Sequence, residues 1–176
     1  MGKGWRADRD SAEKAAQKLL RAFPLDDPRV PVRSIARANG CTLKLTPLDD
    51  DLSGMAFIKD STRAIVVNSN HHPNRQRFTI AHELAHHQLH IPLLERGVHV
   101  DKAIFRRDQN SATGTVQYEI EANHFAAELL MPRKIIKKMI PRDFDLQDDI
   151  ALSNLASRLG VSVAALGYRI QNVFGL

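Results

Sequence analysis

The motif His-Glu-x-x-His at residues 82–86 constrains this chain more than any other stretch of its sequence. Residues four apart on an α-helix lie on one face about one turn from each other, so both imidazoles can bind the same metal ion. Glu83 lies about 100° around the helix from His82, where it can act on a water molecule without being a ligand. No glycine or proline interrupts residues 74–91, and Pro92 follows them. We therefore predict a helix that carries a metal site and a base.

A second interpretation of the motif needs no metal. The same spacing arises by chance in roughly one sequence in a hundred of this kind, and an ordinary core helix with surface histidines would also show it. A metal site needs a third protein ligand, which the helix itself does not supply. The choice between the two interpretations therefore depends on a ligand from another element.

Length and composition favour a single compact domain. The chain has 176 residues, of which 43% are apolar, which is enough to bury one core. The first ten residues are polar and charged, so we expect no signal peptide, and no run of about 18 apolar residues could span a membrane. Cys41 is the single cysteine, which excludes an internal disulfide and a cysteine-based zinc site and fits a cytoplasmic location. The net charge of +5 is a mild bias, because the basic residues are scattered.

The region before the motif is expected to form two helices and a three-stranded sheet. The helices are predicted at 11–23, with Ser11 as N-cap, and at 31–39, and the strands at 42–46, 54–58 and 64–68. An exposed edge of such a sheet can bind a peptide as an added strand, which makes Gly54, Met55 and Ala56 candidate substrate-binding residues. A sheet that only covers the core is an equally good interpretation.

The segment from 91 to 116 shows no strong period, and we expect it to form a lid or a binding loop. His99 and Asp101 lie in it, and either could join the metal site. On the preceding helix, His90 is about 12 Å from His82 and too far to share its metal. We expect His87 and His90 to be structural or solvated, with a hydrogen bond from His90 to a neighbouring element as an alternative. Arg75 and Arg77 are expected to be solvated, with pairing to carboxylates such as Glu119 or the Asp cluster at 49–51 as an alternative.

The third ligand is sought in a predicted helix at residues 117–131, where Glu119 and Glu121 compete. Glu119 lies on a stripe of mostly small and apolar residues, which lets this helix approach the His82 helix closely. The stripe that carries Glu121 is wholly polar, as a solvent-exposed face would be: Glu121, His124 and Glu128. We therefore predict Glu119 as the metal ligand and Glu121 as solvated. Asn123, one turn after Glu119, can hydrogen-bond a ligand histidine or the carboxylate.

The segments RFTIAHELAHHQLH and YEIEANHFAAELLMP, in this order, resemble the ImmA/IrrE family of metallopeptidases. The runs LDDDLSGMAFIKD and AIVVN fit as well, so the resemblance covers roughly residues 10–132 well and the C-terminal helices more loosely. It implies zinc bound by His82, His86 and Glu119, with Glu83 as the base. Family members are often intracellular regulators that cleave or inactivate a DNA-binding repressor, frequently in mobile elements or stress responses. The chain departs from the family at Ala85, where glycine is common; we expect slightly looser helix contact there.

Three more helices are predicted after Met131, at 132–140, 146–159 and 162–174, the last with Ser162 as N-cap. The last two have spacings common in helix-turn-helix units, so one interpretation is DNA contact. We favour a helical hairpin that packs on the core or docks a partner, because its second helix offers few base-reading side chains: Tyr168, Arg169, Gln171 and Asn172. The expected division is a zincin-like domain at 1–140 and a helical tail at 141–176.

These observations predict an α+β protein, with a mainly helical zincin-like core, a small three-stranded antiparallel or mixed sheet, and C-terminal helices. The expected function is that of a zinc-dependent endopeptidase with one Zn²⁺ per chain and a helix-turn-helix repressor as protein substrate. Tyr118 and His99 are candidate donors to the oxyanion. Three alternatives remain open: a non-catalytic regulator that binds DNA or a repressor, an Fe²⁺ or Mn²⁺ site, and a latent protease whose long loop must open.

Overall fold

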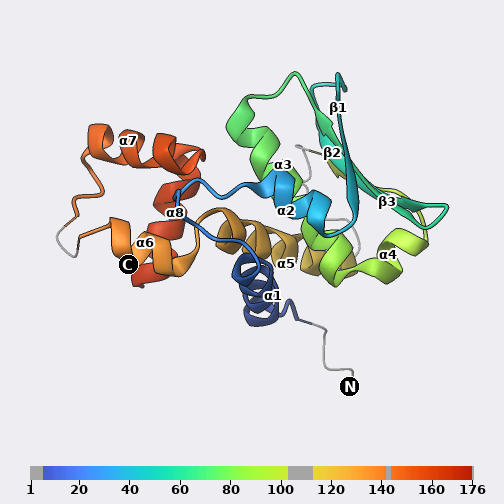
Figure 1. Ribbon diagram of the computed structural model, residues 1–176, viewed down its shortest axis with the longest axis horizontal. Coiled ribbons are helices and arrows are strands. Elements are labelled where there is room, and N and C mark those ends of the chain that lie inside the picture. Colours follow the sequence, from blue (N-terminus) through green and yellow to red (C-terminus); the bar gives the residue numbers. More distant parts are fainter. Residues whose placement is uncertain (1–5, 103–112, 142–143, 176) are drawn as a thin grey trace.

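The structure is a computed structural model that describes residues 6–102, 113–141 and 144–175. Figure 1 shows α3 and α5 in the middle, the sheet and α4 on one side, and α6, α7 and α8 on the other. The helices are α1 (Arg9–Arg21), α2 (Val32–Ala38), α3 (Pro73–Leu89), α4 (Ile91–Glu95), α5 (Thr113–Leu130), α6 (Arg133–Met139), α7 (Asp149–Leu159) and α8 (Val163–Phe174). The strands are β1 (Cys41–Thr46), β2 (Leu52–Lys59), β3 (Thr62–Asn68) and β4 (His99–Lys102). The predicted α+β class is confirmed.

The sheet is mixed and has four strands in the order β1-β3-β2-β4. β1 is parallel to β3, whereas β2 is antiparallel to both β3 and β4. The prediction of three strands is therefore wrong. β4 lies in the segment for which we expected a long irregular loop, and so does α4. β4 has four residues, too few for a period in the sequence, and its pairing with β2 depends on tertiary structure.

Local turn and cap chemistry explains several element boundaries. Asp60 and Ser61 join β2 to β3 with φ of 48° and 62°, the left-handed conformation at both central residues that suits a tight hairpin. α8 begins after Ser162, whose hydroxyl accepts from the amide of Ala165 as expected. α1 begins earlier than predicted, because Asp8 is its N-cap and accepts from the amide of Ser11.

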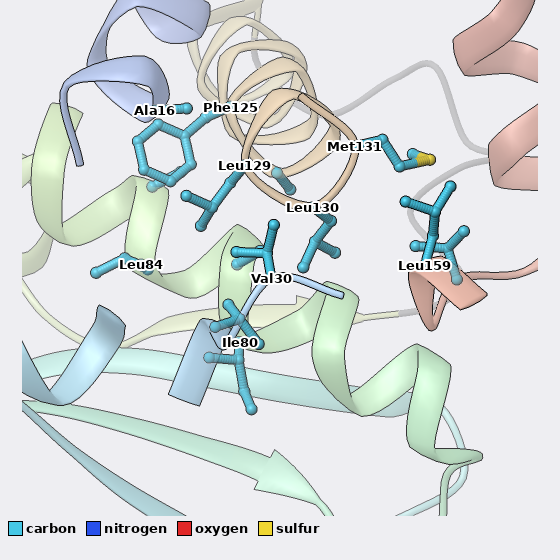
Figure 2. Close-up of a cluster of buried hydrophobic side chains, with 14 of the residues drawn as sticks. Ala16, Val30, Ile80, Leu84, Phe125, Leu129, Leu130, Met131 and Leu159 are labelled. Atoms are coloured by element: carbon cyan, nitrogen blue, oxygen red, sulfur yellow. The ribbon is translucent and has the colours of Figure 1, made fainter. Parts of the chain in front are cut away.

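Small and branched apolar side chains fill the core between α3 and α5 (Figure 2). Ala81 and Ala85 of α3, and Ala122 and Ala126 of α5, are all fully buried. Because alanine adds only a methyl group, the two helix backbones can approach closely at these positions. Larger side chains of the same cluster, shown in Figure 2, surround this contact: Leu84, Phe125, Leu129 and Leu130.

Two of the three residues in the α5 stripe that we predicted to face solvent, Glu121 and Glu128, are buried. The exposed fraction is 8% for Glu121 and 2% for Glu128. Glu128 forms an ion pair with Arg169 of α8 and accepts a hydrogen bond from Gln17 of α1. The prediction is wrong because α1 and α8 cover this face and bring polar partners from both ends of the chain.

Arg77 joins the start of α3 to the corner between α7 and α8, and the prediction that it is solvated is wrong. Its Nε donates to the carbonyl of Gly160 over 3.0 Å, and its Nη2 donates to the carbonyls of Val30 (2.9 Å) and Leu159 (3.4 Å). Gly160 has φ of 67°, and a Cβ there would lie 2.7 Å from Nε of Arg29, so this corner requires glycine. Burial, with the nearby charges of two other arginines, lowers the pKa of Arg77 to about 10.

α7 and α8 differ in direction by 95° at this corner. Their buried side chains, including Leu159, Leu166 and Ile170, belong to the same apolar cluster as those of α3 and α5. Among the helices that the structure describes, none is by itself long and apolar enough to cross a membrane; α7 and α8 pass that test of length and composition only as a bent pair. The division at residue 140 stays a prediction.

Replacing Arg77 by Met should lower the free energy of unfolding by about 2–3 kcal/mol, because buried carbonyl groups lose a charged donor. Guanidinium chloride unfolding in the presence of a chelator measures this change without a contribution from bound metal. Replacing the exposed Arg158 by Met is the matched control and should change the stability by under about 0.5 kcal/mol. Equal effects of the two substitutions would contradict the structural role of Arg77.

Candidate metal centre

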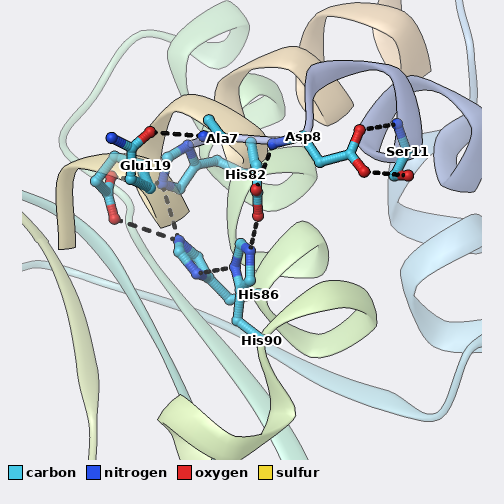
Figure 3. Close-up of polar contacts among 9 residues, drawn as sticks. Ala7, Asp8, Ser11, His82, His86, His90 and Glu119 are labelled. Carbon is cyan, nitrogen blue, oxygen red and sulfur yellow. Dashed lines mark hydrogen bonds and ion pairs between the residues drawn. The ribbon is translucent and has the colours of Figure 1, made fainter. Parts of the chain in front are cut away.

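Side chains from α3, β4 and α5 meet at one point (Figure 3 shows the α3 and α5 members). Nε2 of His82 lies 3.2 Å from Nε2 of His86 and 3.2 Å from a carboxylate oxygen of Glu119. Nε2 of His86 lies 3.5 Å from the other oxygen of Glu119. Nε2 of His99 is 3.2 Å from Glu119 as well, and the ligand atoms of all four residues lie within 4.8 Å of one another. The structure thus brings the three predicted ligands together and adds His99.

These separations fit a metal ion of the size of zinc. Ligand atoms at about 2.0–2.1 Å from a tetrahedral ion lie roughly 3.3 Å from one another. The distances among His82, His86 and Glu119 are 3.2, 3.2 and 3.5 Å. Two neutral imidazoles and one carboxylate are also a donor set that zinc prefers. The cluster could therefore hold a metal ion with little rearrangement.

The outward-facing nitrogen of each histidine of the motif also has a partner. Nδ1 of His82 lies 3.2 Å from Oδ1 of Asn123, one turn after Glu119 on α5. Because an amide oxygen only accepts, Nδ1 of His82 carries a proton, and its Nε2 faces the cluster. Nδ1 of His86 lies 3.0 Å from Nδ1 of His90. His90 therefore contacts a predicted ligand from the side away from the cluster, as its expected distance from the metal allows.

Burial and charge set the protonation of the metal-free cluster. Burial alone would lower the pKa of His82, but the hydrogen bond to Glu119 and the surrounding negative charges outweigh it and raise that pKa to about 9. Burial and the charge of His82 lower the pKa of His86 well below its usual value. Burial disfavours the charged form of Glu119, but hydrogen bonds from His82 and His99 hold its pKa well below the usual range. A metal ion must displace the proton of His82, so binding should weaken as the pH falls.

Glu83 is fully buried, and neither of its carboxylate oxygens has a hydrogen-bond partner in the described part of the chain. Burial raises its pKa well above the usual value; the charge of His82 opposes this, and those of Asp101 and Glu119 add to it. The potential ligand atoms of Asp101 on β4, His82 and Glu83 lie within 4.8 Å of one another. Asp101 is therefore next to the cluster, which is one of the two outcomes that the sequence allowed for it. A buried carboxyl group without a partner is costly, which makes Glu83 a candidate functional residue.

Gly54 positions β2 against α3. A Cβ at Gly54 would lie 2.5 Å from Cγ2 of Thr79, 2.7 Å from the carbonyl oxygen of Val66 and 3.8 Å from Cγ of Glu83. Any side chain there would separate the sheet from the turn of α3 that carries Glu83. The residue thus shapes the pocket of the unpaired carboxylate.

The expected peptide-binding edge at Gly54, Met55 and Ala56 is not free. These residues pair with Val67, Val66 and Ile65 of β3 on one side and with Asp101, Val100 and His99 of β4 on the other. Because β2 lies inside the sheet, its backbone cannot accept another strand. The prediction is wrong because β4, with four residues, is too short to show a period in the sequence. Tyr118, the other candidate substrate contact, packs its ring on that of His90, with centroids 4.6 Å apart.

A groove of about 1370 Å³ adjoins the centre. Its lining includes Ser53, Asp101 and Asn123 near the cluster, and Val163 and Tyr168 of α8. Small-molecule sites usually occupy about 300–1,000 Å³, so the volume of this groove exceeds that of a usual small-molecule site.

Residues 36–171 match the model of the IrrE N-terminal-like domain, an M78 peptidase family. The chain belongs to this family. A relative of 30% identity over 142 residues is "Uncharacterized immunity region protein 2" of Bacillus phage phi105, and the match covers 80% of each chain. The fold is similar to that of a "Mycobacterium tuberculosis transcriptional regulator", with a TM-score of 0.61 and 17% identity over 92% of this chain. The match spans only 46% of the length of that regulator.

Replacing Glu83 by Gln should stabilise the metal-free protein, and more so at high pH. The unfolded chain releases the proton of Glu83 near its ordinary pKa, whereas the folded chain retains it to higher pH. The stability of the native sequence therefore falls as the pH rises above the unfolded value, and the glutamine variant lacks this loss. Melting temperatures in a chelating buffer at pH 4.5 and pH 8 should diverge by a few degrees, at about 2–4 °C per kcal/mol. A difference that does not change with pH would show that Glu83 is ionised in the folded protein.

Proposed function

We propose that the protein is a zinc-dependent endopeptidase in which His82, His86 and Glu119 bind the metal and Glu83 is the catalytic base. The observation that supports this most is the convergence of the three donor groups beside a buried, unpaired carboxylate. Membership of the M78 peptidase family supports the same reaction. Iron or manganese would also suit two histidines and a carboxylate, but the position of Glu83 between the histidines favours hydrolysis.

The mechanism follows from the environment of each group. Bound zinc would polarise the scissile carbonyl and make water acidic enough to attack it near neutral pH. Glu83 accepts a proton from the attacking water, whose oxygen forms a bond to the carbonyl carbon. Glu83 then delivers this proton to the leaving nitrogen as the C–N bond breaks. Asn123 keeps His82 oriented throughout.

We assign His99 to the oxyanion that forms in the transition state. Its ring lies against that of His86 at a tilt of 34°, with centroids 3.8 Å apart, and Nε2 faces Glu119. A catalytic zinc site keeps one position open, so three protein ligands suit the reaction better than four. An imidazole at the rim of the cluster can then donate to the developing negative charge.

We propose a polypeptide substrate, of the class of DNA-binding repressors. The volume of the groove beside the cluster, which exceeds that of a usual small-molecule site, supports a polypeptide. The origin of the phage relative in an immunity region supports a role in controlling a repressor. The alternative, a non-catalytic regulator that binds DNA through α8, has less support, because Arg169 is buried in its ion pair with Glu128. A cytoplasmic location stays a prediction.

Metal analysis of purified variants tests the centre, and the expected result is one zinc per chain in the native protein. His82→Ala and Glu119→Ala should lose it, whereas Glu83→Gln should keep it and lose turnover by about 10²–10⁴-fold, the share of a general base. New termini produced from a peptide library, detected by mass spectrometry, measure turnover. The exposed Glu95→Gln is the matched control and should retain both properties. Turnover retained in Glu83→Gln would remove Glu83 from its role.

The variant His99→Ala tests whether His99 donates to the oxyanion or binds the metal. If His99 stabilises the oxyanion, zinc affinity should stay within about threefold while kcat falls by roughly 10²–10³-fold. Competition with a chromogenic chelator measures the affinity. A loss of zinc affinity comparable to that of His86→Ala would instead make His99 a ligand and contradict the assignment.

A further inference from the structure

We propose that His90 and Glu121 are positioning residues that fix the proton of His86 on Nδ1 and thereby direct the lone pair of its Nε2 to the metal. This inference rests on the proposed metal ligands, and it extends the centre to two residues that do not touch the metal. It also assigns a function to Glu121, for which the sequence predicted only contact with solvent.

Three hydrogen-bonding groups form a row that begins at the ligand His86 and continues through His90 to Glu121. Nδ1 of His86 is 3.0 Å from Nδ1 of His90, and Nε2 of His90 is 2.8 Å from Oε2 of Glu121. The row is buried: His86 is fully buried, and His90 and Glu121 are 3% and 8% exposed. Figure 3 shows the ring of His90 next to that of His86, on the side away from Glu119.

The donors and acceptors of this row can be ordered from its outer end. A carboxylate only accepts, so Nε2 of His90 must carry the proton that Glu121 receives. A neutral imidazole has one N–H and one lone pair, which leaves Nδ1 of His90 as an acceptor. Burial disfavours the doubly protonated ring that would reverse this order. His86 therefore donates from Nδ1, and its Nε2 is free to bind the metal.

The carboxylate at the end of the row is held from its other side. Oε1 of Glu121 accepts from the backbone amide of Asp8 over 2.7 Å, and the amide of Ala7 donates to Gln117 of α5 over 2.8 Å (Figure 3). A carboxylate with both oxygens engaged cannot rotate away from His90. The two motif histidines thus use different supports: an amide of α5 for His82, and a histidine backed by a carboxylate for His86.

Zinc affinity and the tautomer of His86 together test this proposal. His90→Ala and Glu121→Leu should weaken zinc binding by about 10–100-fold, the usual effect of losing such an outer contact. His90→Asn offers an amide oxygen near the former Nδ1 and should recover affinity to within about tenfold of the native protein. Competition with a chromogenic chelator gives each dissociation constant, and melting temperatures identify variants that fail to fold.

The matched control is His87→Asn. His87 is a buried histidine of the same helix, but its Nε2 faces the carbonyl of Ala64 at 3.0 Å, away from the cluster. This variant should lose stability without a change in zinc affinity beyond about threefold. Equal loss of affinity in His87→Asn and His90→Ala would mean that both act only through the fold and would overturn the proposal.

Long-range ¹⁵N–¹H correlation spectra of the histidine rings in the metal-free protein give a readout that needs neither zinc nor turnover. We expect His86 to carry its proton on Nδ1 in the native protein and to lose this preference in His90→Ala. A proton on Nε2 of His86 in the native protein would overturn the proposal. The spectra decide it even if no peptide is cleaved, so failure of the proposed peptidase activity is a distinguishable result.

Discussion

The close approach of α3 and α5 is the constraint on which the rest of the structure depends. Glu119 can reach both motif histidines only if the two helix backbones lie near each other, and the alanines at 81, 85, 122 and 126 allow this. The sheet then covers α3, with Gly54 at the tightest point. The methyl group of Ala85 is fully buried, so α3 accommodates an alanine at this position.

Polar groups inside the protein restrict how these elements are arranged. Glu121 and Glu128 lie two turns apart on α5 and pair with different parts of the chain. Glu121 contacts His90 and the amide of Asp8, whereas Glu128 pairs with Arg169. A buried carboxylate adds little net stability, because removing it from water costs about as much as its partner returns. Such a carboxylate instead restricts the arrangement of the helices, since any arrangement that leaves it buried and unpaired is strongly disfavoured.

The sequence indicated the parts of the site that depend on local geometry. Helical spacing placed His82 beside His86, and the small residues around Glu119 correctly distinguished the face of α5 that meets α3; the roles of these residues stay predictions. The same stripe argument failed for Glu121 because it treats polar residues as solvent-exposed, whereas a polar residue can also pair with a distant element. β4 and the contacts of Arg77 were also missed, because both depend on partners that are distant in the sequence. Four residues of strand and a single arginine show no period, and their partners are set only when the chain has folded.

Arg169 links the order of synthesis to the assembly of the centre. It donates to the carbonyl of Met131 and pairs with Glu13 and Glu128, so residues 156 positions apart in the sequence meet at one guanidinium. Chains fold from the N-terminus as they leave the ribosome, and α5 emerges well before residue 169. During that interval Glu128 lacks its cation and must stay hydrated, which opposes the final packing of the helix that also carries Glu119. A nascent chain therefore cannot complete the packing of α5, the helix that carries the predicted ligand Glu119, until Arg169 has left the ribosome.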